Sequence, residues 1–233
     1  MFRHFQRKIV SSGPAQSSIC MTDTSAIEAY ILAGGASSRM GREKALLELG
    51  GVPMVARMAA LLWPLAEQVT LIAPPEKFVE MPLRVIADDE PGLGPLGGIA
   101  TALRFSHAEW NLVCGCDLPF LTEAWLAHLT ERARYSSADA LLPQGAQGHV
   151  EPLCAMYRTR ARTAIAEALS RGVRKVSDGL AAVRVETIPA AEWKAFDSHG
   201  LLFKNMNSPE DFAEAQAAFA KAPADLWLRG QQR

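Results

Sequence analysis

The segment IEAYILAGGASSRMGREK, residues 27–44, decides the fold of this chain. It opens with seven mostly apolar residues, 27–33, that indicate a buried β-strand, and it continues into a glycine-rich turn. Downstream, short apolar runs alternate with longer segments of helical periodicity. This alternation, with its short connections, predicts an α/β fold: a Rossmann-like, mostly parallel sheet with helices on both faces.

The expected elements follow one another without an internal repeat or a second domain. The sequence predicts strands at residues 27–33, 68–73, 83–88, 110–117, 138–144, 150–158 and 183–189, helices at 55–62, 122–133, 159–172 and 208–220, and a loop that enters a helix at 94–106. Thr122 and Ser208 are expected N-caps, and Gly172 is expected to end its helix. We therefore expect one domain over residues 26–220, with a disordered leader at 1–25 and a tail at 221–233.

Composition argues against several classes of partner. Apolar residues make up 49% and charged residues 21% of the chain, and the formal net charge is −1. This balance gives no reason to expect a nucleic acid or a membrane surface as partner. No apolar run reaches the roughly 18 residues that span a bilayer. Without a disulfide framework or an export signal, we expect a cytoplasmic protein in which Cys114 and Cys116 are buried hydrophobes rather than metal ligands.

The glycine-rich turn after the first strand has the chemistry of an anion site. Open α/β sheets bind ligands at the carboxyl ends of their strands, and this turn lies at such an end. Gly34 and Gly35 let backbone amides approach an anion closely. Arg39 adds a planar guanidinium and Lys44 a compact charge, so we expect the turn to bind a triphosphate. The alternative is a plain glycine turn followed by a solvated basic stretch.

Asp117, in the motif CDLPFL, lies at the carboxyl end of another expected strand. Its carboxylate should project into the same crevice as the glycine-rich turn. Magnesium is held by one or two carboxylates together with phosphate oxygens and water, so a single aspartate is adequate. The alternative role, capping the following helix, is already filled by Thr122. We therefore expect Asp117 to bind Mg²⁺.

Five motifs resemble those of the molybdenum cofactor guanylyltransferase family, which has cytidylyltransferase relatives. The motifs are LAGGASSRMGREK (32–44), DDEPGLGPLGGI (88–99), CDLPFL (116–121), VEPLCAMY (150–157) and NMNSPEDF (205–212). They occur in the family's order and cover roughly residues 28–219. The resemblance implies a fold of the nucleotide-diphospho-sugar transferase type and an enzyme, a nucleotidyltransferase that uses a phosphorylated acceptor.

The resemblance also implies a role for particular residues. Arg39, Lys44 and Asp117 would be catalytic, and Asp117 would be the magnesium ligand. The nucleotide-binding residues would be Leu32, Ala33, Gly34, Gly35, Arg39, Lys44, Asp88, Gly94, Pro95, Leu96 and Asp117. The acceptor-binding residues would be Glu151, Asn205 and Asn207. Glu151 stands before a proline where guanylyltransferases often carry histidine.

The segment DDEPGLGPLGGI has two interpretations. Asp88 directly follows apolar strand residues, so we expect it to face the crevice, and the resemblance implies that it contacts the nucleotide. Residues 94–98 would then form a loop against the base or ribose. In the alternative interpretation, Asp88 and Asp89 are turn residues and the glycine-rich stretch is a plain helix entry.

By resemblance, the reaction transfers GMP from GTP to the phosphate of molybdenum-molybdopterin and releases pyrophosphate. Other cofactor-biosynthesis proteins and apo-molybdoenzymes are further expected partners. One departure concerns the base, because LIAPPEKF (71–78) lacks the asparagine with which guanylyltransferases help to read guanine. The alternatives are a CTP-dependent cytidylyltransferase, a sugar-phosphate nucleotidyltransferase, and a non-catalytic module that delivers the cofactor. Arg39, Lys44 and Asp117 favour an enzyme, since a carrier needs no triphosphate site.

Overall fold

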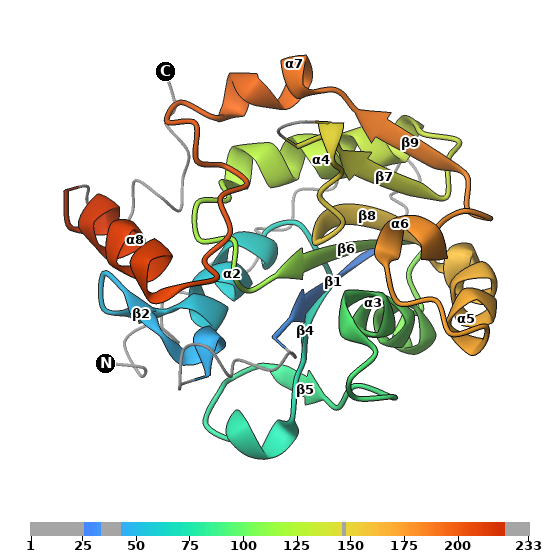
Figure 1. The fold of residues 1–233 in the computed structure, drawn as a ribbon, viewed down its shortest axis with the longest axis horizontal. Coiled ribbons are helices and arrows are strands. Elements are labelled where there is room, and N and C mark those ends of the chain that lie inside the picture. The colour runs from blue at the N-terminus through green and yellow to red at the C-terminus, as the bar shows by residue number, and fades with distance from the viewer. Residues whose placement is uncertain (1–25, 34–42, 146–147, 222–233) are drawn as a thin grey trace, which may run out of the picture.

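The structure is a computed structural model that describes residues 26–33, 43–145 and 148–221. Within these residues, seven strands form one sheet in the order β5-β4-β1-β6-β8-β7-β9 (Figure 1). Strand β8 is antiparallel to β6 and β7, and the other neighbouring strands are parallel. The expected α/β sheet is therefore confirmed. The strands are β1 (Ile27–Leu32), β4 (Gln68–Ile72), β5 (Arg84–Ile86), β6 (Trp110–Gly115), β7 (Ala140–Pro143), β8 (Cys154–Arg158) and β9 (Val185–Ile188).

Strand β1 shows how the sheet carries a core on each face. Ile27, Ala29 and Ile31 pack into one buried cluster, and Tyr30 and Leu32 pack into the other. Successive side chains of a strand point to opposite faces, so this division follows from the pleat. Helices cover both faces, as the sequence predicts.

The helices divide between these two faces. The first cluster includes buried residues of α2 (Met54–Leu62) and α4 (Glu123–Tyr135). The second includes residues of α3 (Gly94–Phe105), α5 (Arg162–Ser170) and the short α6 (Val176–Gly179). Two further short elements, α7 (Ala190–Trp193) and the 3-10 turn η6 (Lys194–Phe196), follow β9.

A third, smaller apolar cluster lies under the helix α8 (Pro209–Lys221). A small hairpin, β2 (Glu48–Leu49) and β3 (Val52–Pro53), contributes to it and contacts α8 (Figure 1). The hairpin turns at Gly50 and Gly51, whose φ angles are +60° and +75°. Two consecutive positive φ angles are typical of the tight turns that match strand twist.

The expected helix boundaries are confirmed at three positions. Thr122 caps α4 by accepting a hydrogen bond from the Trp125 amide at 3.3 Å. Ser208 caps α8 by accepting from the Asp211 amide at 3.2 Å, and Asp211 accepts from the Ser208 amide at 2.8 Å in return. Such reciprocal bonds satisfy two amides that the helix leaves unpaired. Gly172, at φ +84°, follows the end of α5.

Two local expectations are wrong. Residues 94–98 do not form a loop, because α3 already begins at Gly94, and Leu96 is fully buried against Gly179. Residues 150–153 are not part of a continuous strand, because β8 begins at Cys154. Val150 instead forms an isolated bridge with Gln144.

No helix in the described part of the chain combines the length and the apolar character needed to cross a membrane.

Candidate active site

Three parallel strands bring the segments that follow them to one edge of the sheet. Leu32, at the end of β1, pairs in register with Ile72 of β4 and Gly115 of β6. The chain continues this contact beyond the strands, since the Ala33 amide donates to the Ile72 carbonyl at 3.1 Å. The Cys116 amide donates to the Leu32 carbonyl at 3.1 Å. Leu32 and Ala33 therefore lie beside the Asp117 segment. Gly34, Gly35 and Arg39 lie outside the described residues.

Lys44 meets a residue from the far end of the chain. Lys44 begins the 3-10 turn η2 (Lys44–Leu46), and its Nζ donates to Oδ1 of Asn207 at 3.0 Å. These two residues are 163 positions apart, and the resemblance implies separate roles for them. The ammonium group can make three hydrogen bonds, so the amide oxygen can orient it while other N–H groups bind an anion.

Asp117 lies two residues beyond β6 and is half-buried. Burial raises the pKa of its carboxyl group, and the positive charge of Lys44 partly opposes this shift. The carboxylate folds back over Gly115, where an added Cβ would lie 2.6 Å from Asp117 Oδ1. The Asp117 carbonyl accepts from the Met206 amide at 2.9 Å. This bond fixes residues 205–207, here called the asparagine segment, to the loop that carries Asp117.

Glu151 brings a second carboxylate to the same place. Burial raises the pKa of Glu151, and the negative charge of Asp117 raises it further. The Glu151 amide donates to the Pro143 carbonyl at 2.8 Å, and the Glu151 Oε1 lies over Gly145, in the space that a Cβ would fill. A bound cation would favour the ionised forms of both groups, because a nearby opposite charge lowers the pKa of a carboxyl group.

The asparagine segment is anchored between its two asparagines. Met206 is buried, whereas Asn205 and Asn207 are exposed. The two asparagines are therefore accessible to a ligand. The Asn207 amide also donates to the Asp211 carboxylate at 2.9 Å, which ties the segment to the start of α8.

Asp88 lies against α3. Its Oδ1 accepts from the Thr101 hydroxyl at 2.6 Å, and that hydroxyl accepts from the Asp89 amide at 3.2 Å. Asp89 forms a two-pronged ion pair with Arg104. Asp88 and Asp89 line a groove of about 550 Å³ between α3 and α5. The turn interpretation of Asp88 and Asp89 thus agrees with these bonds, and a nucleotide contact of Asp88 stays a prediction.

One ion pair that no sequence pattern predicted involves Glu43, near the end of the segment 27–44. Lys77, in the 3-10 turn η3 (Pro75–Lys77) after β4, pairs with Glu43 at 2.7 Å. This pair joins the end of the glycine-rich segment to the segment LIAPPEKF. No spacing rule relates positions 34 residues apart in two loops, so only the opposite charges offered a signal.

Cys114 and Cys116 lie in the core, as expected. Cys114 and Cys116 are buried in the first apolar cluster, and burial raises the pKa of the Cys116 thiol. Within the described residues, no three side chains among His, Cys, Asp and Glu are placed to hold one metal ion. A cation at this edge would therefore depend on Asp117, Glu151, substrate oxygens and water.

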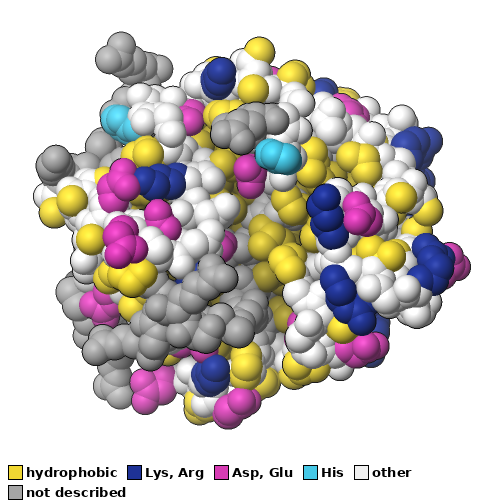
Figure 2. All heavy atoms as spheres, in the orientation of Figure 1, with side chains coloured by type: hydrophobic (Ala, Val, Ile, Leu, Met, Phe, Trp, Pro, Cys, Tyr) yellow, Lys and Arg dark blue, Asp and Glu magenta, His cyan; other side chains and the backbone are white. Residues whose placement is uncertain are grey.

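Figure 2 shows one face of the molecule in space-filling form. Hydrophobic side chains line a hollow in the middle of this face, and acidic, basic and histidine side chains lie around the hollow. A concave, largely apolar surface with a few charged groups at its rim is the usual form of a small-molecule site.

Comparison with known proteins identifies the family. The MobA-like NTP transferase domain matches residues 29–185. The chain belongs to this family. It is 36% identical to a probable molybdenum cofactor guanylyltransferase of Pelotomaculum thermopropionicum over 200 residues, which cover 85% of this chain and 96% of the relative. A protein of the same description from Trichormus variabilis is 37% identical over 83% of this chain and 92% of its own length.

Solved structures agree with this membership of the MobA-like family. The molybdopterin-guanine dinucleotide biosynthesis protein A of Archaeoglobus fulgidus superposes with a TM-score of 0.73 at 28% identity, over 84% of this chain and all of the other. The 2-C-methyl-D-erythritol 4-phosphate cytidylyltransferase of Thermus thermophilus has a TM-score of 0.62 at 19% identity, over 84% and 99% of the two chains, and so shares the fold. The resemblance, the fold type and the assignment as a nucleotidyltransferase are confirmed.

Proposed function

We propose that this chain transfers GMP from GTP to the phosphate of molybdenum-molybdopterin and releases pyrophosphate. The observation that carries the proposal is the meeting of Lys44, Asp117 and Asn207 at the carboxyl edge of the sheet, three residues from three of the family motifs. The two relatives described as guanylyltransferases favour GTP as donor.

The chemistry requires positioning and charge neutralisation more than proton transfer. An oxygen of the acceptor phosphate attacks the α-phosphorus, and the bond from that phosphorus to the oxygen bridging to the β-phosphate breaks. A phosphomonoester has a second pKa of about 6, so the acceptor is already ionised at neutral pH. No catalytic base is then required, and the barrier falls mainly by alignment and by stabilisation of the charge that develops.

Among the described residues, the ammonium group of Lys44 is placed to stabilise the negative charge of the departing pyrophosphate. Asn207 holds its ammonium group at 3.0 Å and limits its freedom. Preorganised donors of this kind are effective because they need no rearrangement as charge develops. Arg39, Gly34 and Gly35 would complete the triphosphate site; their part remains a proposal.

The residues present fit a divalent cation, and we propose Mg²⁺. Asp117 and Glu151 are two partly buried carboxyl groups whose pKa values are both raised, mainly by burial, so a bound cation would favour their ionised forms. Hard cations such as Mg²⁺ are held by one or two carboxylates together with substrate phosphates. When bound, the ion would supply charge neutralisation at the phosphate oxygens. Asp117 would hold it directly, and Glu151 would face the acceptor side.

Pyrophosphate release tests the proposal. The protein would be supplied with Mg²⁺ and molybdenum-loaded molybdopterin, and GTP, CTP, ATP and UTP would be compared in parallel. Release with GTP alone is the expected result, and release with CTP alone would instead identify a cytidylyltransferase. Silence with all four nucleotides would reject the acceptor, and sugar phosphates would then be tested. Delivery to apo-molybdoenzymes and contacts with other biosynthetic proteins remain predictions.

A further inference from the structure

The third apolar cluster lies beneath the candidate active site and joins its parts. Each of three site-bearing segments sends an apolar side chain into this cluster. Leu49 follows Lys44 by five residues, Phe120 follows Asp117 by three, and Met206 separates the two asparagines. The relative placement of the site residues therefore depends on packing in one small cluster, to which α8 contributes Ala215 and Phe219.

Three side chains that stack on one another, Arg57, Phe219 and Phe120, form a column that packs α8 against this cluster. The rings of Phe219 and Phe120 are stacked, with centroids 5.7 Å apart and an interplanar angle of 28°. The guanidinium carbon of Arg57, from α2, lies 4.2 Å from the centroid of the Phe219 ring. The column thus joins α2, α8 and the loop that follows Asp117, and Figure 1 shows α8 beside α2 and β2.

Arg57 lies on the core-facing side of α2, which is an unusual position for an arginine. It is 3% exposed, and within the described residues none of its three guanidinium nitrogens has a hydrogen-bond partner. Burial lowers its pKa to about 10, so it is charged at neutral pH. A buried cation without a carboxylate weakens a fold, and an aromatic face offsets this only in part. Local rules of stability are broken most often where function sets the sequence.

Arg57 also reaches the neighbours of Asp117. It lines a void of about 10 Å³ together with Cys116, Leu118 and Pro119. The Asp117 carbonyl in turn accepts from the Met206 amide at 2.9 Å. A displacement of the Arg57 side chain would therefore pass both to the Asp117 loop and to the asparagine segment.

We propose that Arg57 and Phe219 are positioning residues for the transfer reaction. They fasten α8 to α2 and to the loop after β6, and this holds residues 205–207 beside Asp117. They act through that segment rather than by contact with the substrate. The inference rests on the proposed function for its catalytic readout, and it has a second readout that does not involve catalysis.

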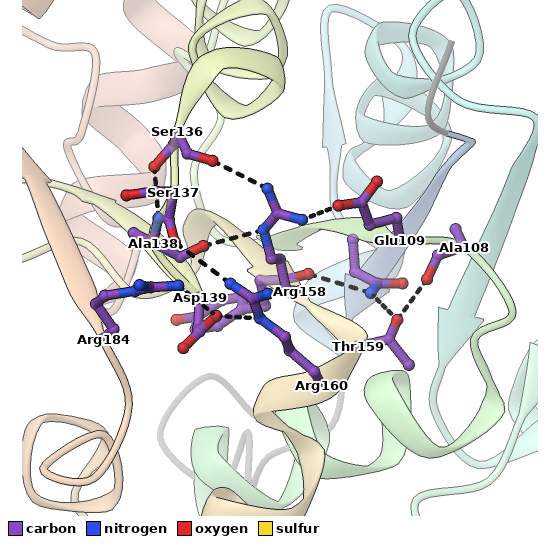
Figure 3. A network of polar contacts seen from close by, with 12 residues as sticks. Ala108, Glu109, Ser136, Ser137, Ala138, Asp139, Arg158, Thr159, Arg160 and Arg184 are labelled. Atoms are coloured by element: carbon purple, nitrogen blue, oxygen red, sulfur yellow. Dashed lines mark hydrogen bonds and ion pairs between the residues drawn. The ribbon is translucent and has the colours of Figure 1, made fainter. Parts of the chain in front are cut away.

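The test compares Arg57→Met with Arg158→Met. Arg158 also lies over an aromatic ring, at 4.4 Å from the Trp110 centroid, but carbonyl oxygens and a carboxylate surround its guanidinium (Figure 3). Arg57→Met is expected to raise Tm, because it removes a buried charge that has no hydrogen-bond partner among the described residues. It should nevertheless lower kcat about tenfold, through loss of alignment, with the KM for GTP within about twofold of wild type. Arg158→Met is expected to do the opposite, lowering Tm and leaving kcat unchanged.

Hydrogen exchange at the Met206 amide is the second readout. In Arg57→Met it should become faster although Tm rises, while residues 154–158 keep their exchange rates. Arg57→Lys, which keeps a cation over the ring, should restore most of kcat. Wild-type silence with every nucleotide would reject the proposed function but leave the exchange test standing.

Two results would overturn the positioning role. One is an Arg57→Met protein with unchanged kcat and unchanged Met206 exchange, and the other is a fall of Tm and kcat together. If Arg57→Met does not fold, Phe219→Leu takes its place, with Phe105→Leu as control. Phe105 lies under Arg104 at 4.3 Å, so the control removes the same kind of pair on α3. A loss of kcat and faster Met206 exchange only in Phe219→Leu supports the role, and equal effects in both variants contradict it.

Discussion

Polar groups are paired differently at the two ends of the parallel strands. The end at which these strands begin is the amino edge, and the end at which they finish is the carboxyl edge. At the amino edge, Arg158 donates to the carbonyl oxygens of Ser136 and Ala138, at 2.9 and 3.0 Å, and pairs with Glu109 (Figure 3). Thr159 accepts from the Asn111 side chain at 2.9 Å nearby. These bonds close the loops that lead into the strands, as expected of an edge that serves stability.

At the carboxyl edge, burial disfavours the charged forms of several ionisable groups. Burial raises the pKa values of Asp117 and Glu151 and lowers that of Arg57. Each shift means that the charged form is less favoured than in water. The comparison teaches that the two edges have different tasks. At the amino edge the Arg158 guanidinium is paired within the chain, whereas the carboxyl edge gathers partly buried charged groups that a ligand can bind.

Asp117→Ala tests the comparison with the largest expected effect. We expect turnover to fall below detection while the circular dichroism spectrum stays that of the wild type, because the variant lacks the proposed metal ligand. The control is Asp139→Ala at the amino edge, where Asp139 pairs with Arg160 and Arg184. That control should keep wild-type activity. An Asp117→Ala protein with near wild-type turnover would remove the metal assignment.

Lys44→Ala should have the next largest effect. Loss of one preorganised donor to a developing charge typically costs about 2–4 kcal/mol, or roughly 30- to 1000-fold in kcat. Initial rates with saturating GTP and acceptor would measure it. The exposed Lys194→Ala serves as the charge-matched control and should be silent. A loss of less than about threefold in Lys44→Ala would show that pyrophosphate leaves without help from this side chain.

Asp117→Asn should stabilise the protein in the absence of metal. Because burial raises the folded-state pKa of Asp117, ionisation favours the unfolded chain. The destabilisation therefore grows as pH rises through that raised pKa and is absent below the ordinary aspartate pKa of about 3.9. Thermal denaturation at pH 7 should give Asp117→Asn the higher Tm, and the difference should vanish in acid.

Magnesium sharpens the same measurement. Millimolar Mg²⁺ should raise the Tm of the wild type and leave that of Asp117→Asn unchanged, since a ligand stabilises only the state that binds it. Equal stabilisation of both proteins by Mg²⁺ would argue against Asp117 as its ligand.

Thr159→Val, at the amino edge, should have the smallest effect. The Thr159 hydroxyl donates to the Ala108 carbonyl and accepts from Asn111, whose amide also donates to the Tyr157 carbonyl. Valine keeps the shape but removes these bonds, so we expect a loss of about 1–2 kcal/mol in the free energy of unfolding. Urea denaturation would measure it. A change in kcat would show that the amino edge also affects the reaction, which would contradict the separate roles of the two edges.

Much of the fold was predictable from local patterns. The apolar run 27–33 and its glycine-rich continuation predict a parallel strand with a ligand site at its end, and β1 occupies residues 27–32. Thr122 and Ser208 were predictable as caps because their hydroxyls satisfy amides in the same turn of chain. Asp117 was predictable at the site edge because strand direction alone places it there.

The remaining features depend on contacts between distant segments. No local rule relates Lys44 to Asn207, which become neighbours only when α8 packs against the hairpin. Helical periodicity predicted α2 without showing that Arg57 faces inward, because a charged residue on a helix usually faces water. Residues 94–98 were expected to form a loop, but burial of Leu96 against Gly179 favours the helix from its first turn.

Transfer of label from GTP labelled with phosphorus-32 at the α-phosphate tests the central claim most directly. The wild-type protein would be incubated with Mg²⁺ and molybdenum-loaded molybdopterin, and the pterin product would be isolated and counted. The account predicts label in the pterin product with GTP, none with α-labelled CTP, and none with Asp117→Ala. Label that stays in GTP, or that enters the pterin only from CTP, would contradict guanylyl transfer by this chain.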